Sequence, residues 1–167
     1  MTIPDNDSIS FAVRGTPTPK GSLTRMPSGA MIPAGTAESR KRMESWRMDI
    51  RNEARRAMGE RPAISGPVRL FVEFAFLPPK SIPKRQQGWI MHTKKPDVDK
   101  LFRALSDALT GIVWRDDSQV CMSAINKVYA WDGVSGAVVS VEPISDDSAR
   151  TISAQTKFIR DRVRNAS

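Results

Sequence analysis

The spacing of apolar residues predicts two main helices and four strands in this chain. Alternating apolar and polar side chains are typical of a half-buried strand, whereas apolar side chains three or four positions apart line one face of a helix. In chain order, the patterns predict a strand over 8–14, a helix over 36–58, a strand over 66–77, a helix over about 97–110, and strands over 120–131 and 136–141. This order indicates an α+β fold, with a small mixed or antiparallel sheet of about four strands covered by the two helices.

Turn and capping residues set the bounds of these elements. Thr36 is a suitable N-cap for the first helix, and Gly59 ends it. Asp132-Gly133 is a hairpin signal, so we expect the last two strands to pair with each other. Residues 15–34 are rich in Gly, Pro, Ser and Thr, which predicts a surface loop. The strand over 66–77 is rich in Val and Phe and is expected at the centre of the sheet.

Length and charge favour one domain with an anionic partner. The chain has 167 residues, enough for one hydrophobic core. Lys and Arg number 26 against 18 Asp and Glu, and the resulting net charge of +8 favours nucleic acid or another anionic surface as the partner. We expect the domain to occupy 1–144 and to be followed by a basic C-terminal extension over 145–167, where spaced apolar residues indicate a short helix.

The residue inventory excludes several classes of site. One His and one Cys are too few for a zinc site or for Cys–His catalysis within one chain. Cys121 stands in an apolar strand and is interpreted as a buried thiol. No apolar run approaches the ~20 residues that span a bilayer, and the first residues lack the layout of a signal peptide. We therefore expect a cytoplasmic protein with no membrane association and no organic cofactor.

Four carboxylates flank the second predicted helix. Asp97 and Asp99 belong to its first turn, and Asp116 and Asp117 follow its end. A single Asp at a helix start would need no explanation beyond capping and the helix dipole. Four carboxylates that meet would repel one another unless a cation lies between them, and such hard oxygen ligands select Mg²⁺ or Mn²⁺. An acidic metal pocket in a basic protein indicates phosphate-ester chemistry.

The segment KKPDVDKLFRALSDALTGIVWRDDSQV, residues 94–120, resembles the signature of the RusA family of Holliday junction resolvases. In that family, an acidic pair ahead of a helix and an Asp-Asp-x-Gln-Val segment after it form a metal site. The resemblance implies that Asp97, Asp99 and Asp117 are the essential carboxylates, with Asp116 as a lesser candidate ligand. It also implies a Mg²⁺-dependent, homodimeric endodeoxyribonuclease, of a type common in phages, with Mn²⁺ as the alternative ion. The expected reaction is cleavage of branched DNA, such as a four-way junction, by attack of a metal-activated water on a phosphodiester.

Two positions depart from the family pattern. Lys100 stands where many members have Asn, and Arg103 stands where the family often has a functional Lys. Arginine keeps the positive charge, but its planar guanidinium is not equivalent to an ammonium group. Because Arg103 lies one helical turn after Asp99, we expect it to stabilise charge on the phosphate or to hold Asp99 in place.

Cationic side chains supply the predicted DNA contacts. Four arginines form one row along the helix over 36–58, which either follows a DNA strand or is a solvated face with neighbouring acids as partners. The loop over 15–34 either grips phosphates with its two cations or is an ordinary solvated loop. The full set of predicted contacts is Lys20, Arg25, Arg40, Arg47, Arg51, Arg55, Lys94, Lys95 and Lys100.

Several other residues have an ordinary interpretation beside a functional one. Glu73 is expected on the solvent face of its strand rather than at a metal. His92 is interpreted as a surface or hydrogen-bonding residue rather than a general base, since a metal-bound hydroxide needs no His to form. Lys127 lies either near the metal or on a solvent face. Trp114 and Trp131 are more typical of a core than of base stacking.

Two other classes of function remain open. A non-catalytic DNA-binding protein would use the basic row but would gain nothing from clustered aspartates. A metal-dependent transferase could use Asp-x-Asp to hold the phosphates of a nucleotide, although 167 residues is small for a nucleotide-sugar domain.

Overall fold

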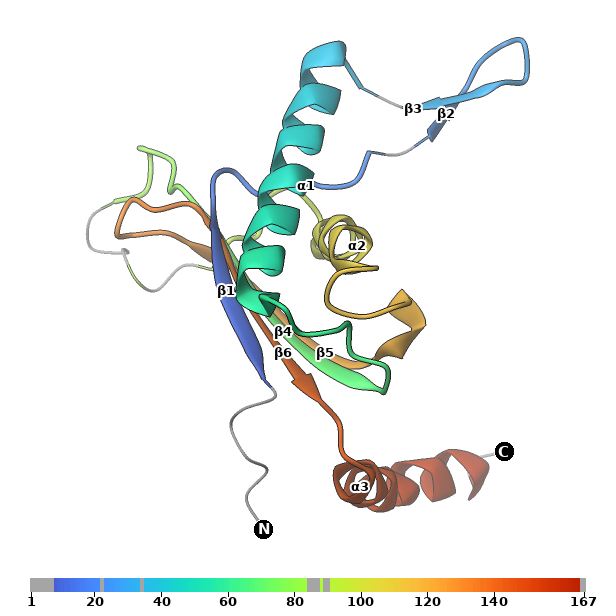
Figure 1. The fold of residues 1–167 in the computed structure, drawn as a ribbon. Coiled ribbons are helices and arrows are strands. Elements are labelled where there is room, and N and C mark those ends of the chain that lie inside the picture. The colour runs from blue at the N-terminus through green and yellow to red at the C-terminus, as the bar shows by residue number, and fades with distance from the viewer. Residues whose placement is uncertain (1–7, 22, 34, 84–87, 89–90, 166–167) are drawn as a thin grey trace.

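A four-stranded sheet forms the centre of the computed structural model, which describes residues 8–21, 23–33, 35–83, 88 and 91–165. Its strands are β1 (Ile9–Arg14), β4 (Val68–Phe76), β5 (Val120–Tyr129) and β6 (Gly136–Pro143). Their order across the sheet is β1-β6-β4-β5 (Figure 1). β4 and β5 are parallel, whereas the other neighbours are antiparallel. The sheet is therefore mixed and β4 is central, as predicted.

Two helices, α1 (Ala37–Met58) and α2 (Val98–Leu109), cover one face of the sheet (Figure 1). Thr36 is the N-cap of α1, and its side-chain oxygen accepts a hydrogen bond from the Ser39 backbone N–H at 3.2 Å. The apolar stripes of both helices pack on the alternate residues of the strands that point toward them. Fully buried residues of this core include Ile50, Leu70, Phe74, Leu101, Leu105, Trp114, Val139 and Val141. The α+β prediction is thus confirmed.

The prediction that the last two strands pair as a hairpin is wrong. β6 pairs with β1 on one side and β4 on the other, so β4 separates it from β5. The burial of the strands explains this order, because β6 buries Ala137, Val139 and Val141, whereas most of β5 is exposed or half-buried. A strand with a buried face gains from two neighbours, while an exposed strand suits the edge. The turn after β5 reverses the chain without making the two strands partners.

The segment predicted as a surface loop contains a small hairpin. β2 (Leu23–Arg25) and β3 (Met31–Pro33) pair antiparallel, and the Met26 N–H donates to the Ala30 carbonyl at 2.8 Å to close the turn. The hairpin projects beyond the start of α1 (Figure 1). At the base of this arm, the Lys20 N–H donates to the Lys100 carbonyl at 3.1 Å. The arm is therefore tied to the first turns of α2.

The C-terminal segment is one helix, α3 (Asp146–Asn165), and is longer than the short helix expected there. Figure 1 shows α3 beyond the end of β6, at the opposite end of the molecule from the β2–β3 hairpin. Within the described part of the chain, none of the helices combines the length and apolar character that a bilayer crossing requires.

Cys121 is exposed, so the prediction of a buried thiol is wrong. The register explains its position: Val120 pairs with Val68 and Met122 with Arg69, which leaves Cys121 as the extra residue of a bulge on the edge strand. The strand pattern in the sequence could not show this shift. Two other predictions hold, since Glu73 is exposed on its strand and Trp114 is fully buried in the core.

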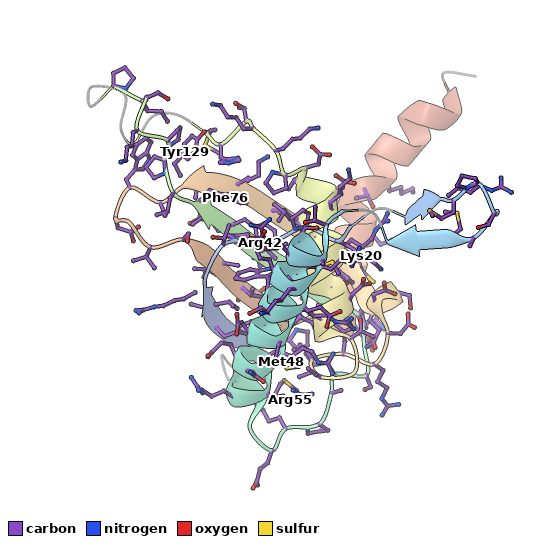
Figure 2. All side chains as sticks on the ribbon, turned by 90° about the horizontal axis from the view of Figure 1, so that it is seen from above. Lys20, Arg42, Met48, Arg55, Phe76 and Tyr129 are labelled. Atoms are coloured by element: carbon purple, nitrogen blue, oxygen red, sulfur yellow. The ribbon has the colours of Figure 1, made fainter. Side chains whose placement is uncertain are left out.

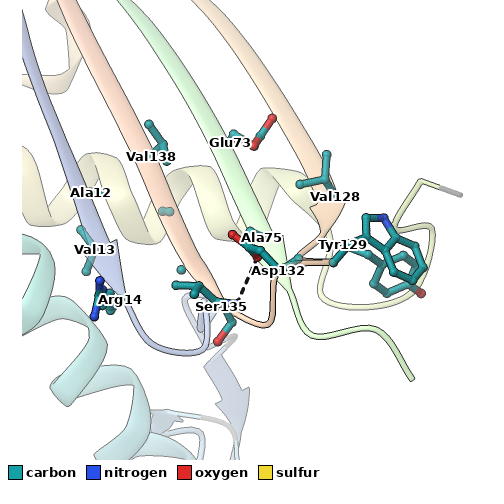
Figure 3. A pocket seen from close by; sticks show the side chains of 15 residues that line it. Ala12, Val13, Arg14, Glu73, Ala75, Val128, Tyr129, Asp132, Ser135 and Val138 are labelled. Atoms are coloured by element: carbon teal, nitrogen blue, oxygen red, sulfur yellow. Dashed lines mark hydrogen bonds between the residues drawn. The ribbon is translucent and has the colours of Figure 1, made fainter. Parts of the chain in front are cut away.

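Within the described part of the chain, no helix lies against the face of the sheet away from α1 and α2 (Figure 1). This face exposes the apolar side chains of Phe71, Met122 and Val138. At one end of this face lies a cavity of about 530 Å³ next to the turn that follows β5 (Figure 3). Its lining includes Glu73 and Asp132, but none of the residues predicted to bind metal or DNA.

Candidate active site

The start of α2 sends its two carboxylates in different directions. Asp97 is the N-cap with extended backbone angles, and Asp99 belongs to the first helical turn. Residues two positions apart on a helix do not face each other, because each residue turns the chain by about 100°. Asp97 and Asp99 accordingly line two different cavities, of about 640 Å³ and 320 Å³. The two Asp residues of the Asp-x-Asp pattern thus lie in two separate cavities, one on each side of the start of α2.

The smaller cavity brings Asp99 and Asp117 together. Asp117 begins the 3-10 helix η2 (Asp117–Gln119), which leads directly into β5. Arg103, one turn after Asp99 on α2, lines the same cavity. The remaining lining residues are Phe102, Ser106 and Val120. Two of the three predicted essential carboxylates and the predicted cationic residue therefore share one site.

Asp97 lies in a cationic environment next to that site. Its side chain makes no capping hydrogen bond, so capping does not explain an Asp at this position, and only the favourable interaction with the helix dipole remains as the ordinary explanation. The Oδ2 of Asp97 lies 3.4 Å from the Nζ of Lys100. Arg42 and Lys95 line the same cavity. The N-terminal segment Thr16–Pro19 forms the facing wall.

Asp116 has a structural role at the turn before β5. Its Oδ1 accepts a hydrogen bond from the Ser118 backbone N–H at 2.9 Å, and it is the N-cap of η2. The hydrogen bonds from Ser118 lower the pKa of Asp116 below its usual value. These contacts orient the turn that carries Asp117 into the cavity.

Gln119 holds the same turn against the start of β4, a role that the sequence did not reveal. Its side-chain oxygen accepts from the backbone N–H groups of Arg115 and Asp116 at 2.8 and 3.0 Å. Its side-chain nitrogen donates to the carbonyls of Ile64 and Gly66 at 2.9 and 2.7 Å. All the hydrogen-bonding groups of this amide are thus used. The Gln of the Asp-Asp-x-Gln-Val pattern was the available signal.

Lys127 and His92 fix the segment that leads into α2. The Lys127 Nζ donates to the carbonyls of Lys94 and Pro96 at 2.6 and 2.7 Å. His92 is buried between the rings of Phe76 and Tyr129, with centroid distances of 4.4 and 4.8 Å. The expectation of a surface His92 is therefore wrong, because the side chain is buried, and its Nδ1 has no hydrogen-bond partner among the described residues. Burial, followed by the charge of Lys127, lowers the pKa of His92.

The arginine row on α1 divides into structural and free members. Arg51 Nη1 donates to the Ala108 carbonyl at 3.2 Å, and Arg40 Nη1 donates to the Gly35 carbonyl at 2.9 Å. Arg47 lines a small cavity between α1 and α2, and Arg55 is exposed near the end of α1 (Figure 2). Within the described ranges, none of the four forms an ion pair, so the acidic partners considered from the sequence are not used.

The other predicted DNA contacts lie around the start of α2 and on the arm. Lys20 forms an ion pair of 2.5 Å with Asp107 of α2 and is only partly available to a phosphate. Arg25, on β2, is exposed, as are Lys94, Lys95 and Lys100. Figure 2 shows Lys20 between α1 and the β2–β3 hairpin.

The donor set of the smaller cavity suits a hard divalent cation. Mg²⁺ is usually bound through one or two carboxylates, with water and substrate phosphates as its other ligands. Asp99 and Asp117 supply two carboxylates in an open cavity that leaves room for water and phosphate. Over the described ranges, however, no three His, Cys, Asp or Glu side chains gather closely enough to form a complete protein cage for a metal. The residues fit an ion held by two carboxylates.

Comparisons with known proteins match most of this chain to a known family. A family model described as Endodeoxyribonuclease RusA matches residues 16–142, a range that contains every predicted site residue and excludes α3. The chain is also similar to a protein of Bacillus subtilis (strain 168) named Uncharacterized protein YqaN. The two are 32% identical over 135 residues, which cover 74% of this chain and 89% of the relative.

Proposed function

The chain belongs to the RusA family of endodeoxyribonucleases, and from this membership we propose that it is a Mg²⁺-dependent enzyme that cleaves branched DNA such as Holliday junctions. Its reaction would take place in the cytoplasm of a bacterium or of a phage-infected cell. The observation that carries the proposal is the cavity shared by Asp99, Arg103 and Asp117, which come from α2 and from the turn before β5.

Asp99 and Asp117 would hold the ion, with Mn²⁺ as an alternative to Mg²⁺. Bound there, the metal would supply a water of lowered pKa as the nucleophile for phosphodiester hydrolysis. Arg103 lies in the same cavity, where its guanidinium can contact the phosphate and stabilise the charge that develops on its oxygens. Asp97 lines the neighbouring cationic cavity and pairs with Lys100 there, so we assign it to the edge of the site.

The cationic surface around this site supports a DNA substrate. Arg42, Lys95 and Lys100 line the cavity that contains Asp97, and Arg55 is a further exposed cation on α1. Such cations bind the phosphate backbone without reading sequence, which suits an enzyme that recognises the shape of DNA. Arg51 is assigned instead to the contact between the two helices, because its guanidinium is half-buried against the end of α2.

The homodimer expected from the resemblance is also part of the proposal. A two-fold dimer would present two active sites to opposite strands of a junction. The face of the sheet away from α1 and α2, with Phe71, Met122 and Val138 exposed, is the apolar surface that a second copy would cover. Light scattering should give a mass of twice the 18.5 kDa chain, and a monomer mass at the concentration used for cleavage would contradict the dimer.

Cleavage of a labelled four-way junction and a linear duplex, with and without Mg²⁺, tests the activity. We expect the parent protein to cut the junction only with Mg²⁺, and Asp99→Asn to lower the rate by about 100-fold while junction binding is retained. Asp49→Asn makes the same chemical change at an exposed position of α1 outside the site and should cut like the parent.

The outcomes separate the alternative functions. Tight junction binding without cleavage by the parent protein would favour a non-catalytic DNA-binding protein. Full activity of Asp99→Asn would remove this carboxylate from the reaction. Turnover of a nucleotide-sugar with no effect on junction DNA would favour a transferase, although the endonuclease family of the chain already argues against that class.

A further inference from the structure

Lys127 points toward the helix-covered side of the sheet, where a charged side chain is unusual. It stands opposite Phe74 of β4, whose side chain is fully buried on that side. Paired residues on neighbouring strands share a face, so Lys127 leaves the sheet on the core side. Over the described part of the chain it forms no ion pair, and its ammonium group donates to two backbone carbonyls instead. The positive charge is therefore used to hold main chain.

The two carbonyls belong to the residues that lead into α2. The Pro96 carbonyl, 2.7 Å from the Lys127 Nζ, is part of the peptide group that joins Pro96 to Asp97. Fixing this oxygen fixes the plane of that peptide and the position of the Asp97 Cα. The second carbonyl, of Lys94, lies 2.6 Å from the same nitrogen. Hydrogen bonds from a charged donor are about twice as strong as neutral ones, which favours a fixed geometry.

A second connection ties the same segment to the same strand residue. The His92 N–H donates to the Lys127 carbonyl at 3.3 Å, and the His92 ring is stacked on Phe76. Lys127 thus contacts the segment over 92–96 through both its main chain and its side chain. The start of α2, with Asp97 and Asp99, follows immediately.

We propose that Lys127 is a positioning residue, which orients the main chain ahead of α2 so that Asp99 reaches the bound ion and Asp97 faces the bound DNA. This inference rests on the proposed nuclease function. Two of the three ammonium donors of Lys127 already bind these carbonyls, so the positioning role needs no direct contact between Lys127 and the substrate. Groups that orient metal ligands typically change metal affinity or activity by 10–100-fold when they are removed, so we expect an effect of about that size.

Three variants test the inference. Lys127→Met keeps most of the apolar stem of the side chain but removes all donors. Lys127→Arg keeps donors and charge, and Lys41→Met removes an exposed lysine of α1 as a control. Each is compared with the parent for hydrogen exchange of the segment over 93–99, for binding of Mn²⁺ alone, and for kcat and KM on a four-way junction.

We expect Lys127→Met to speed exchange of that segment, to weaken Mn²⁺ binding by about 10-fold, and to lower kcat by about 10–100-fold with KM within about 3-fold of the parent. Lys127→Arg should recover most of the Mn²⁺ affinity and most of kcat, and Lys41→Met should behave as the parent. Faster exchange with unchanged Mn²⁺ binding and unchanged kcat would overturn the inference, because Lys127 would then only stabilise the segment. Unchanged exchange would overturn it as well.

Failure of the proposed nuclease function can be recognised separately. If the parent protein cuts no DNA, that function fails, but exchange and Mn²⁺ binding still decide the role of Lys127. If Lys127→Met shows both faster exchange of the segment and weaker Mn²⁺ binding, positioning is supported. If it shows neither change, the inference is overturned. If the parent cuts the junction and Lys127→Met cuts equally well, only the inference about Lys127 fails.

Discussion

Gln119 shows how one side chain can hold an active-site turn in place. Its amide bridges the turn that carries Asp117 and the chain that enters β4, through four hydrogen bonds. A carboxylate has the same shape but cannot donate a hydrogen bond, so it would leave the Ile64 and Gly66 carbonyls facing another acceptor. The amide nitrogen is thus the part of this residue that a substitution can test.

We predict that Gln119→Glu lowers the free energy of unfolding by about 2–3 kcal/mol, since two half-buried carbonyls lose their donor and the new charge lies beside two aspartates. Urea titration of parent and variant measures the loss. Asn52→Asp, the same amide-to-carboxylate change at an exposed position of α1, should stay within about 0.5 kcal/mol of the parent. An equal loss in both variants would show that added charge, rather than the lost donor, is responsible.

His92 should make stability depend on pH. Burial and the nearby Lys127 and Lys94 place its pKa in the folded protein below the value of 6.5 for an unperturbed His. The unfolded chain therefore binds this proton more readily than the folded protein, and stability rises with pH through this range. The contribution is complete above pH 6.5 and is lost as the pH falls through the lowered pKa.

We predict that the urea midpoint of the parent decreases as the pH is lowered from 7.5 to 5.5. His92→Phe should flatten this dependence, and it keeps a ring between Phe76 and Tyr129. Because the chain has one His, no other imidazole contributes in this interval. Asp116, whose pKa is lowered below 3.8, loses its contribution only at more acidic pH. A variant with the same pH dependence as the parent would contradict the assignment to His92.

At the scale of the elements, periodicity predicted more than the turns did. The apolar spacing gave α1, α2 and the four sheet strands in their correct order, because each pattern reports which face a segment buries. Asp132-Gly133 led to a wrong hairpin, since a local turn does not determine which strands become neighbours. The bulge at Cys121 and the hydrogen bonds of Lys127 could not be predicted either, because both depend on contacts between segments that are distant in the sequence.

The candidate site was predictable in its residue types and only partly in its geometry. The family motif pointed to Asp97, Asp99, Arg103 and Asp117, and three of these share a cavity. That Asp97 faces another cavity follows from the helical turn at the start of α2, which the sequence hypothesis of four meeting carboxylates did not take into account. Gln119 could have been selected from the same motif, but its four partners are visible only in the fold.

The pairing of β1 with β6 depends on a glycine. A Cβ atom at Gly136 would lie 2.1 Å from the Val13 carbonyl oxygen, which belongs to the backbone of the neighbouring strand and cannot rotate away. We predict that Gly136→Ala lowers the free energy of unfolding by about 3 kcal/mol and speeds hydrogen exchange in β1. Gly66→Ala is the matched control, because a Cβ there meets nothing within 4 Å, and it should change stability by no more than about 0.5 kcal/mol. Equal stability of the two variants would show that β1 can shift without cost.

At the scale of the whole molecule, the net charge of +8 makes salt dependence the measure of which cations contact DNA. Arg51 and Arg55 lie one turn apart on α1, yet Arg51 donates to the last turn of α2, while Arg55 is exposed without an ion pair in the described structure. A residue that neutralises a phosphate releases counterions when it binds, whereas a residue that joins two helices does not. Loss of a phosphate contact should therefore change the salt dependence of DNA binding, whereas loss of a contact between two helices should change the stability of the protein.

We predict that Arg55→Met reduces the magnitude of the slope of log K against log salt for junction binding by about 1, because one phosphate contact is lost. The unfolding midpoint should stay unchanged. Arg51→Met should lower the free energy of unfolding by about 1 kcal/mol, since the C-terminal carbonyls of α2 lose a cationic donor, and should keep the slope of the parent. Fluorescence anisotropy of a labelled junction in EDTA, over a series of salt concentrations, measures the slope without cleavage. If Arg51→Met also reduced the slope, the whole row would follow the DNA, as the sequence pattern first suggested. If Arg55→Met left it unchanged, the DNA path would run instead over the cations around Lys95 and Lys100, beside the cavity that holds Asp97.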